Sequence, residues 1–464
     1  MQVWEWVYLM QRVMVGWFSG YAMGMAAVCA LTAPPAQGEE VQEGLSLSGA
    51  MRLRYEAIDG QSRVGFNRRD DLLNLRTNVL ARYREADIEV AVELYDSRVW
   101  GDRAGTPVST NEVNAFEPVQ AYVARTFQDP LGAGSRVTVT AGRMMLNLGS
   151  RRLVAADDYR NTTNGYTGMK ADFAAGGEWK GTFIYTLPQV RLPDRLEDVR
   201  SAKVKLDRES FDLVLWGGQI SRAKTIGLAT LEFTYFHLGE RDAPRRPTRD
   251  RSLDTFGGRL ILDPNPSRFD YEIEAFYQTG SVSTSTAASA ERQSVTASFI
   301  HADGGYTFPG AWTPRLSVEY DRASGDKPGG KFGRFDTLFG MRRADLAPAG
   351  LYNALARTNI ETVGVRLEAK PSKHLDWFAA YRPMWLAARQ DSFSSTGVRD
   401  ASGRSGNFAG HQLEGRVRYW LIPKRLQFEL DGLVLARERF LRKAPNATEG
   451  KWTRYVSFNL IGTI

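Results

Sequence analysis

The chain has 464 residues, of which 60 are basic and 53 acidic, and its formal net charge is +7. This length exceeds that of a usual single-core domain, but one closed sheet around a wet interior accommodates it as a single unit. Of the basic residues, 12 are lysine and 48 arginine. Arginine binds carboxylates and phosphates through two parallel hydrogen bonds, so the composition favours an anionic partner. The sequence contains neither a basic helix nor an aromatic stacking module, which disfavours nucleic acid.

The N-terminal segment resembles an export leader. Residues 13–33 form an uncharged apolar run after Arg12, and the small residues Ala36 and Gly38 follow it. This pattern predicts a signal peptide over residues 1–38 and leaves residues 39–464 as one domain. A retained membrane anchor is the alternative, since the run is long enough to cross a bilayer. Cys29, the single cysteine, falls in the leader, so we expect no disulfide and no thiolate metal site in the mature chain.

Past the leader, apolar and polar residues alternate with the period of a β-strand that has one apolar and one wet face. In the first such segment, Leu45, Leu47 and Leu53 interleave with serine and arginine. The same pattern predicts eighteen strands, at residues 45–57, 71–83, 87–98, 117–128, 135–143, 164–174, 178–187, 209–220, 225–238, 253–263, 268–280, 292–303, 312–322, 359–370, 374–388, 407–420, 425–437 and 452–463.

The connections between these segments alternate between short turns and long polar loops. Short turns are expected at DPLGAG from Asp129, SRAK from Ser221 and PNPS from Pro264, while residues 144–163 and 323–358 are long loops. A transmembrane antiparallel β-barrel has this alternation, because its periplasmic turns are short and its extracellular loops long. Eighteen strands also satisfy the even number that such barrels require. The predicted fold is therefore an outer-membrane barrel, with lipid as its surroundings, and a soluble β-sandwich or secreted β-protein is the alternative.

If the apolar phase of each strand faces lipid, the other phase lines the lumen. That phase carries eight arginines: Arg52, Arg54, Arg76, Arg82, Arg366, Arg382, Arg416 and Arg418. It also carries seven glutamates: Glu89, Glu93, Glu272, Glu274, Glu319, Glu414 and Glu429. These charges either form ion pairs between neighbouring strands or, with Arg143 and an inward-folded loop presenting Arg151 and Arg152, form a binding track for anions.

Two segments resemble the alginate export family of outer-membrane barrels. The first is GRMMLNLGSRRLVAADDYRNTTNGYTGMKADF, from Gly142 to Phe173, and the second is GRFDTLFGMRRADLAPAGLYNALARTNIETVGVRL, from Gly333 to Leu367. The resemblance implies an eighteen-stranded barrel that exports alginate or another anionic polysaccharide through an arginine-rich lumen, with periplasmic secretion proteins as partners. By match to these motifs, Arg143, Asn147, Arg152, Arg334 and Asp336 are expected at the constriction or its support.

Other chemistry has weaker signals. The four histidines show no metal-ligand spacing, and Asp157 with Asp158 supplies too few oxygens for a cation site. We therefore expect no metal, no cofactor and no enzymatic activity. Two alternatives stay open. One is a general or small-anion porin without polymer specificity, and the other is an outer-membrane hydrolase built on His301 near Asp303.

Overall fold

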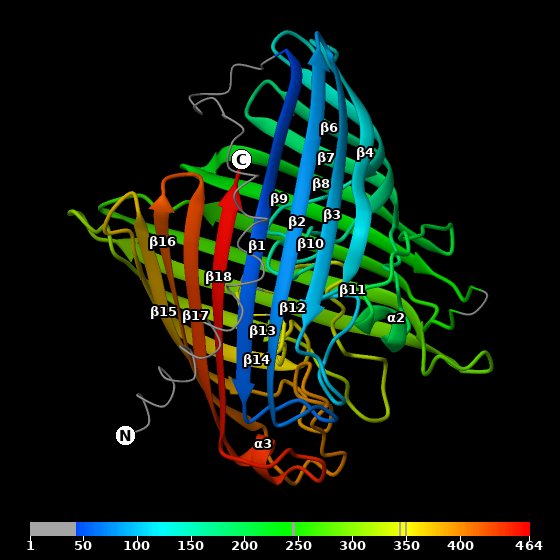
Figure 1. The fold of residues 1–464 in the computed structure, drawn as a ribbon, viewed down its shortest axis with the longest axis vertical. Coiled ribbons are helices and arrows are strands. Elements are labelled where there is room, and N and C mark those ends of the chain that lie inside the picture. Colours follow the sequence, from blue (N-terminus) through cyan, green and yellow to red (C-terminus); the bar gives the residue numbers. More distant parts are fainter. Residues whose placement is uncertain (1–42, 244–245, 343–344, 349) are drawn as a thin grey trace, which may run out of the picture. The chain divides into compact units, whose positions relative to one another are not determined.

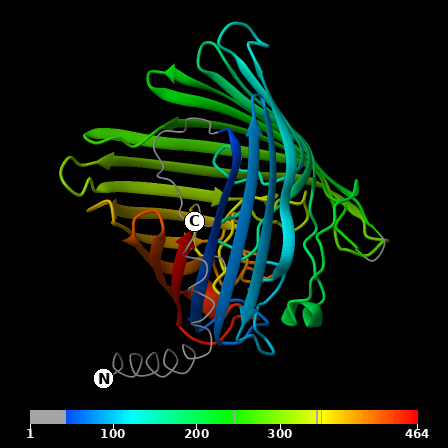
Figure 2. The same cartoon turned by 45° about the horizontal axis from the view of Figure 1, so that its top comes forward.

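Eighteen antiparallel strands form one closed sheet in the computed structural model, which describes residues 43–243, 246–342, 345–348 and 350–464. Each strand pairs with its neighbours in sequence, and β1 also pairs with β18, which closes the barrel. Figures 1 and 2 show the strands as one continuous curved wall. The fold prediction is confirmed, whereas the predicted leader at residues 1–38 lies outside the described residues.

The strands are β1 (Gly44–Asp59), β2 (Arg69–Glu85), β3 (Ile88–Trp100), β4 (Asn114–Gln128), β5 (Arg136–Met144), β6 (Tyr166–Ala175), β7 (Trp179–Pro188), β8 (Leu213–Ile226), β9 (Ala229–Glu240), β10 (Ser252–Leu262), β11 (Arg268–Ser283), β12 (Arg292–Thr307), β13 (Arg315–Ala323), β14 (Ile360–Ala369), β15 (Leu375–Trp385), β16 (Phe408–Ile422), β17 (Leu426–Arg437) and β18 (Trp452–Thr463). Two short helices, α2 (Leu196–Arg200) and α3 (Arg439–Lys443), lie in loops.

Each predicted strand overlaps an observed one, and the clearest error is the turn after β8. The SRAK segment from Ser221 belongs to β8, which continues to Ile226, and the turn is formed by residues 227–228. Lys224 has φ 52° and the pairing register with β9 shifts between Arg222 and Ile226. A bulge of this kind lets polar residues sit inside a strand, so polarity alone placed the turn too early.

Burial is inverted relative to a soluble protein. On β1, Leu45 and Leu47 are 68% and 64% exposed, whereas Arg52 and Arg54 are 5% and 2% exposed. Apolar residues on the outer face and polar residues on the inner face are the arrangement of a barrel that spans a membrane. No helix in the described ranges is long and apolar enough to cross a membrane.

The two ends of the barrel differ in their connections. One end has short turns, at residues 86–87, 129–135, 176–178, 227–228, 263–267, 308–314, 370–374 and 423–425. The other end has the long loops, at residues 60–68, 101–113, 145–165, 189–212, 241–251, 284–291, 324–359, 386–407 and 438–451. We call these the turn end and the loop end. By the rule for such barrels, the turn end is periplasmic and the loop end extracellular.

Candidate functional site in the barrel interior

The 145–165 loop folds into the barrel and does not flare outward. The Arg52 guanidinium of β1 donates to the Asp158 carbonyl oxygen at 2.9 Å, and Ser97 Oγ of β3 donates to the Asn161 carbonyl oxygen at 2.6 Å. Asn161 Nδ2 in turn donates to the Leu75 carbonyl oxygen of β2 at 3.2 Å. Because Arg52 lies on the inner face of its strand, these contacts place the loop inside the lumen, as the sequence led us to expect.

A second long loop, residues 324–359, meets the first inside the barrel. Val154 and Phe339 form an isolated parallel β-bridge, in which Phe339 N donates to the Leu153 carbonyl oxygen at 2.9 Å. Met341 N donates to the Arg151 carbonyl oxygen at 3.0 Å. The two segments that carry the family resemblance are thus joined backbone to backbone, although nearly 200 residues separate Val154 from Phe339 in the sequence.

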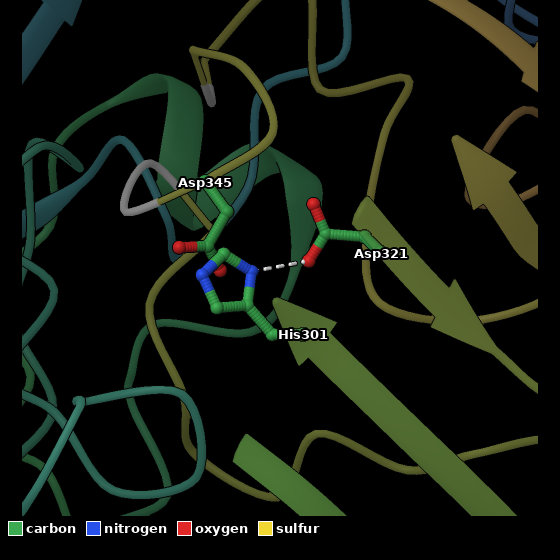
Figure 3. A group of neighbouring side chains, drawn as sticks. All are labelled: His301, Asp321 and Asp345. Carbon is green, nitrogen blue, oxygen red and sulfur yellow. Dashed lines mark hydrogen bonds and ion pairs between the residues drawn. The ribbon is translucent and has the colours of Figure 1, made fainter. Parts of the chain in front are cut away.

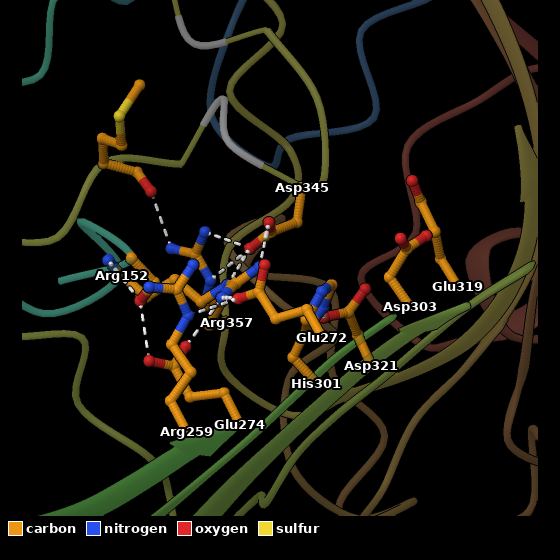
Figure 4. Close-up of polar contacts among 12 residues, drawn as sticks. Arg152, Arg259, Glu272, Glu274, His301, Asp303, Glu319, Asp321, Asp345 and Arg357 are labelled. Carbon is orange, nitrogen blue, oxygen red and sulfur yellow. Dashed lines mark hydrogen bonds and ion pairs between the residues drawn. The ribbon is translucent and has the colours of Figure 1, made fainter. Parts of the chain in front are cut away.

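Arg152 is the centre of an ion network that ties both loops to the wall (Figure 4). Its guanidinium contacts Glu272 and, at 2.7 Å, Glu274, both on β11, and it pairs with Asp345 of the second loop at 2.8 Å. Arg357 also pairs with Asp345 and donates to the Met341 carbonyl oxygen at 2.7 Å. Burial alone would raise the pKa of Asp345, but these two guanidinium groups hold it well below its usual value.

His301 of β12 lies between two carboxylates (Figure 3). Its Nδ1 is 2.8 Å from Asp321 Oδ1 of β13, and the ligand atoms of His301, Asp321 and Asp345 lie within 4.8 Å of one another. This spacing suits a metal ion. However, Arg152 and Arg357 already neutralise Asp345 and would repel a cation there. Asp303, which the sequence placed near His301 as a candidate for a hydrolase, bonds Arg315, whereas His301 bonds Asp321.

All eight predicted lumen arginines on strands lie on one arc of the wall, from β14 through β18 and β1 to β2. Three of them, Arg52, Arg54 and Arg76, form no ion pair with any described residue. Arg52 and Arg76 donate to loop carbonyl oxygens, and Arg54 donates to Asn459 at 2.6 Å and stacks over the Tyr159 ring at 4.0 Å. These three therefore hold the 145–165 loop against the basic arc.

The other five arginines of this arc pair with carboxylates. The pairs are Arg82–Glu89 at 3.4 Å, Arg366–Glu368 at 2.9 Å, Arg382–Glu319 at 3.4 Å, Arg416–Asp376 at 3.5 Å and Arg418–Glu429 at 2.5 Å. Arg82, Arg366 and Arg418 keep 32%, 21% and 35% of their side-chain surface exposed. The expected ion pairs are therefore present, and these three side chains still face the lumen.

The adjoining arc, from β9 to β13, is predominantly acidic. Its inner side carries Glu232, Asp270, Glu272, Glu274, Asp303, Glu319 and Asp321, against Arg259 and Arg315 from the same strands. Arg152 and Arg357 of the inward loops supply further positive charge to this wall. The lumen therefore has a basic side and an acidic side, which the sequence period alone did not separate.

Four motif residues lie elsewhere than on the lumen wall. Arg143 is in register with Ala121, on the face where Val123 is 52% exposed, and pairs with Glu117 at 2.5 Å and Glu209 at 2.9 Å. By this register Arg143 is on the outward phase of β5, where it joins the wall to the 189–212 loop, and its expected role at the constriction or its support stays a prediction.

Asn147, Arg334 and Asp336 brace loops. Asn147 Oδ1 accepts from Ala156 N at 3.1 Å within the first inward loop. Arg334 pairs with Asp391 of the 386–407 loop at 2.7 Å, and Asp336 pairs with Arg251 at 2.8 Å. Arg151 pairs with Asp158 at 3.3 Å and stays 42% exposed. These four residues therefore brace single loops or join two loops, and their expected places at the constriction, its support or the anion track stay predictions.

The sequence analysis did not predict several buried polar residues that hold the loops in place. Arg357 and Arg437 are among the most deeply buried side chains, and Asn359 is fully buried. All three lie at or beyond strand ends, where no alternating pattern assigns a side chain to a face. The sequence feature that could have pointed to them is their position, either within the Gly333–Leu367 segment or at the end of a strand.

Comparison with known proteins agrees with this architecture. A family model described as "Alginate export" matches residues 44–453. Solved structures with similar folds include Pseudomonas aeruginosa OccK2 (OpdF) in complex with glucuronate, at 10% identity and TM-score 0.55, covering 90% of this chain and 96% of that one. Acinetobacter baumannii OccAB1 matches at 12% identity and TM-score 0.56, covering 90% of this chain and 96% of that one.

Pseudomonas aeruginosa OccD3 (OpdP) matches at 11% identity and TM-score 0.54, covering 91% of both chains. No curated protein matches the sequence. The solved structures support the fold, and the family model spans nearly the whole described barrel. The chain belongs to the alginate export family of outer-membrane β-barrel proteins.

Proposed function

We propose that this outer-membrane channel for anionic solutes exports an alginate-like polysaccharide, delivered by periplasmic secretion proteins. The observation that carries the proposal is the arc of eight arginines inside the barrel, from β14 to β2. A polyuronate bears one carboxylate on each sugar, so neighbouring guanidinium groups can bind successive sugars bidentately.

The paired state of these arginines suits transport. Arg366 and Arg418 are partly exposed and each already has a carboxylate partner. A passing uronate competes with that partner and is released when the protein carboxylate returns. Binding that is favourable but exchangeable is the condition for conduction through a selective pore.

Neutralising the exposed arginines of the arc tests the proposal. We expect R366Q/R418Q to lower anion preference, measured as the reversal potential in a KCl gradient across a planar bilayer. We also expect it to weaken block by a defined oligomannuronate about tenfold. R259Q removes one arginine from the acidic arc and should not reduce anion preference. Equal effects of the two variants would count against the basic arc as the anion path.

A general or small-anion porin is the second candidate. The interlocked 145–165 and 324–359 loops narrow the lumen, which favours small solutes over a polymer. A similar fold has been solved with glucuronate, a single uronate sugar. Oligouronates of increasing length separate the two functions. Block that strengthens steadily with length and is followed by passage of the longer chains supports the exporter, whereas exclusion of everything beyond a disaccharide supports the porin.

A further inference from the structure

A pocket lies at the loop end, apart from the barrel interior described above. Its volume is about 460 Å³, and segments 326–328 and 386–390 line it together with Gly406 and Asn407. These segments belong to the 324–359 and 386–407 loops. A volume of this size is in the range of small-molecule sites.

The pocket walls are held in place by buried polar residues. Asp391 Oδ2 accepts from Asp326 N at 3.0 Å and from the Arg334 guanidinium at 2.7 Å, which fixes the two loops to each other. Asn359, fully buried, accepts from Ala388 N at 2.7 Å and donates to the Ala388 carbonyl oxygen at 3.0 Å. The cavity is therefore preorganised, so a ligand would not have to order it.

Two cations of the pocket have no protein partner. Lys327 and Arg389 are exposed, and neither side chain forms an ion pair or hydrogen bond with another residue in the described part of the chain. Gln390 and Asn407 add amide groups, and the exposed Pro328 adds apolar surface. Asp326 is the single carboxylate among the lining residues, and its Oδ1 accepts from Gly333 N at 3.0 Å.

The loop end as a whole carries excess positive charge. The nine long loops contain 30 basic and 20 acidic residues, an excess of 10, whereas the eight turns contain 4 of each. Anions are thus attracted toward the end of the barrel where the pocket lies.

We infer that this pocket is a binding site for acidic sugar residues of the polymer at the extracellular end of the channel. Lys327 and Arg389 would bind the sugar carboxylate, while Gln390 and Asn407 hydrogen-bond ring hydroxyls and Pro328 contacts the apolar face of the ring. The inference rests on the proposed function, and it assigns to that function a site outside the lumen.

Side-specific block of single channels tests the site. Tetramannuronate is added to the loop side of wild-type channels, and the residence time of each blocking event is measured. We expect K327E/R389E to shorten the residence time about tenfold, because two charge-assisted contacts are replaced by repulsion, while the conductance of the unblocked channel stays unchanged.

The matched control is K331E/R404E, which makes the same charge change in the same two loops outside the pocket lining. Its residence time should change less than twofold. Equal shortening in both double variants would show that net loop charge, and not the pocket, is responsible, and an unchanged residence time in K327E/R389E would also overturn the inference.

Two further measurements keep the inference separate from the proposed function. If tetramannuronate blocks wild type from neither side, both the site and the exporter function fail. If it blocks wild type and K327E/R389E alike, only the site fails. Equilibrium binding of tetramannuronate and of neutral maltotetraose to the purified barrel, with the uncharged variant K327Q/R389Q alongside, checks the result without reversed charge. The neutral sugar should bind all forms equally weakly.

Discussion

At the scale of single residues, Arg151 and Arg152 show how neighbours of one type take opposite roles. Arg152 is 5% exposed and pairs with Glu272, Glu274 and Asp345, whereas Arg151 is 42% exposed and pairs with the exposed Asp158. The sequence predicted that both face the lumen. The sequence could not show which of the two is buried, because the partners of Arg152 lie on β11 and in a second loop far along the chain.

Replacing each arginine by methionine, which keeps most of the side-chain volume, should separate these roles. We expect R152M to lower the free energy of unfolding by about 3–5 kcal/mol, since it removes the guanidinium that pairs with the buried Glu274 and takes one of two arginine partners from Asp345. R151M should change it by less than about 1 kcal/mol. Urea titration of the folded barrel in detergent, followed by gel mobility, measures both, and similar losses in the two variants would contradict the assignment of Arg152 as the hub.

Glu112, in the 101–113 loop, is expected to make the stability of the barrel depend on pH. Its burial, together with the nearby Glu56 carboxylate, raises the pKa of Glu112 to about 7. The folded state therefore holds this proton more tightly than the unfolded state. The stability loss from ionising Glu112 is absent below about pH 4, grows as the pH rises, and is complete above about pH 7.

The variant E112Q removes that ionisation and should be more stable than wild type at pH 8, by up to about 3 kcal/mol. At pH 4 the two proteins should be equally stable within about 1 kcal/mol, because the wild-type carboxyl is then neutral as well. Thermal unfolding at the two pH values provides the measurement. An advantage of E112Q that is the same at pH 4 and pH 8 would show that ionisation is not its cause.

At the scale of elements, strands were predictable and loop positions only partly so. The two-residue period located every strand because each has one face in lipid and one in the lumen. Long loops lack such a period. That the 145–165 loop folds inward followed from its polarity and place, but its pairing with the 324–359 loop at Val154 and Phe339 depends on tertiary contacts that no local pattern encodes.

The closeness of the two inward loops predicts the effect of a single methyl group. A Cβ on Gly340 would lie 1.8 Å from the Arg152 carbonyl oxygen, a backbone atom that cannot move aside alone. We expect G340A to separate the loops and so to give larger and noisier single-channel conductance. G330A, in the same loop, is the control, since a Cβ there meets nothing within 4 Å. Wild-type conductance and noise in G340A would show that this contact does not set the width of the pore.

At the scale of the whole molecule, the barrel was predictable because its closure follows from strand number and alternating connections. The distribution of charge around the lumen was not. Each strand's inner phase is visible in the sequence, but the division into a basic arc from β14 to β2 and an acidic arc from β9 to β13 needs the order of strands around the barrel. The difference in charge between the two ends likewise emerges only when loops and turns are assigned to opposite sides.

That difference between the ends predicts a directional salt effect. The loops carry an excess of 10 positive charges, whereas the basic and acidic residues of the turns balance. Long-range attraction should therefore speed the capture of an oligouronate added on the loop side more than on the turn side. Raising KCl from 0.1 to 1 M shortens the Debye length from about 10 to about 3 Å. The association rate should then fall several-fold more steeply for loop-side addition. Blocking-event frequencies of oriented channels give both rates, and equal salt slopes from the two sides would show that the loop charges do not steer the anion.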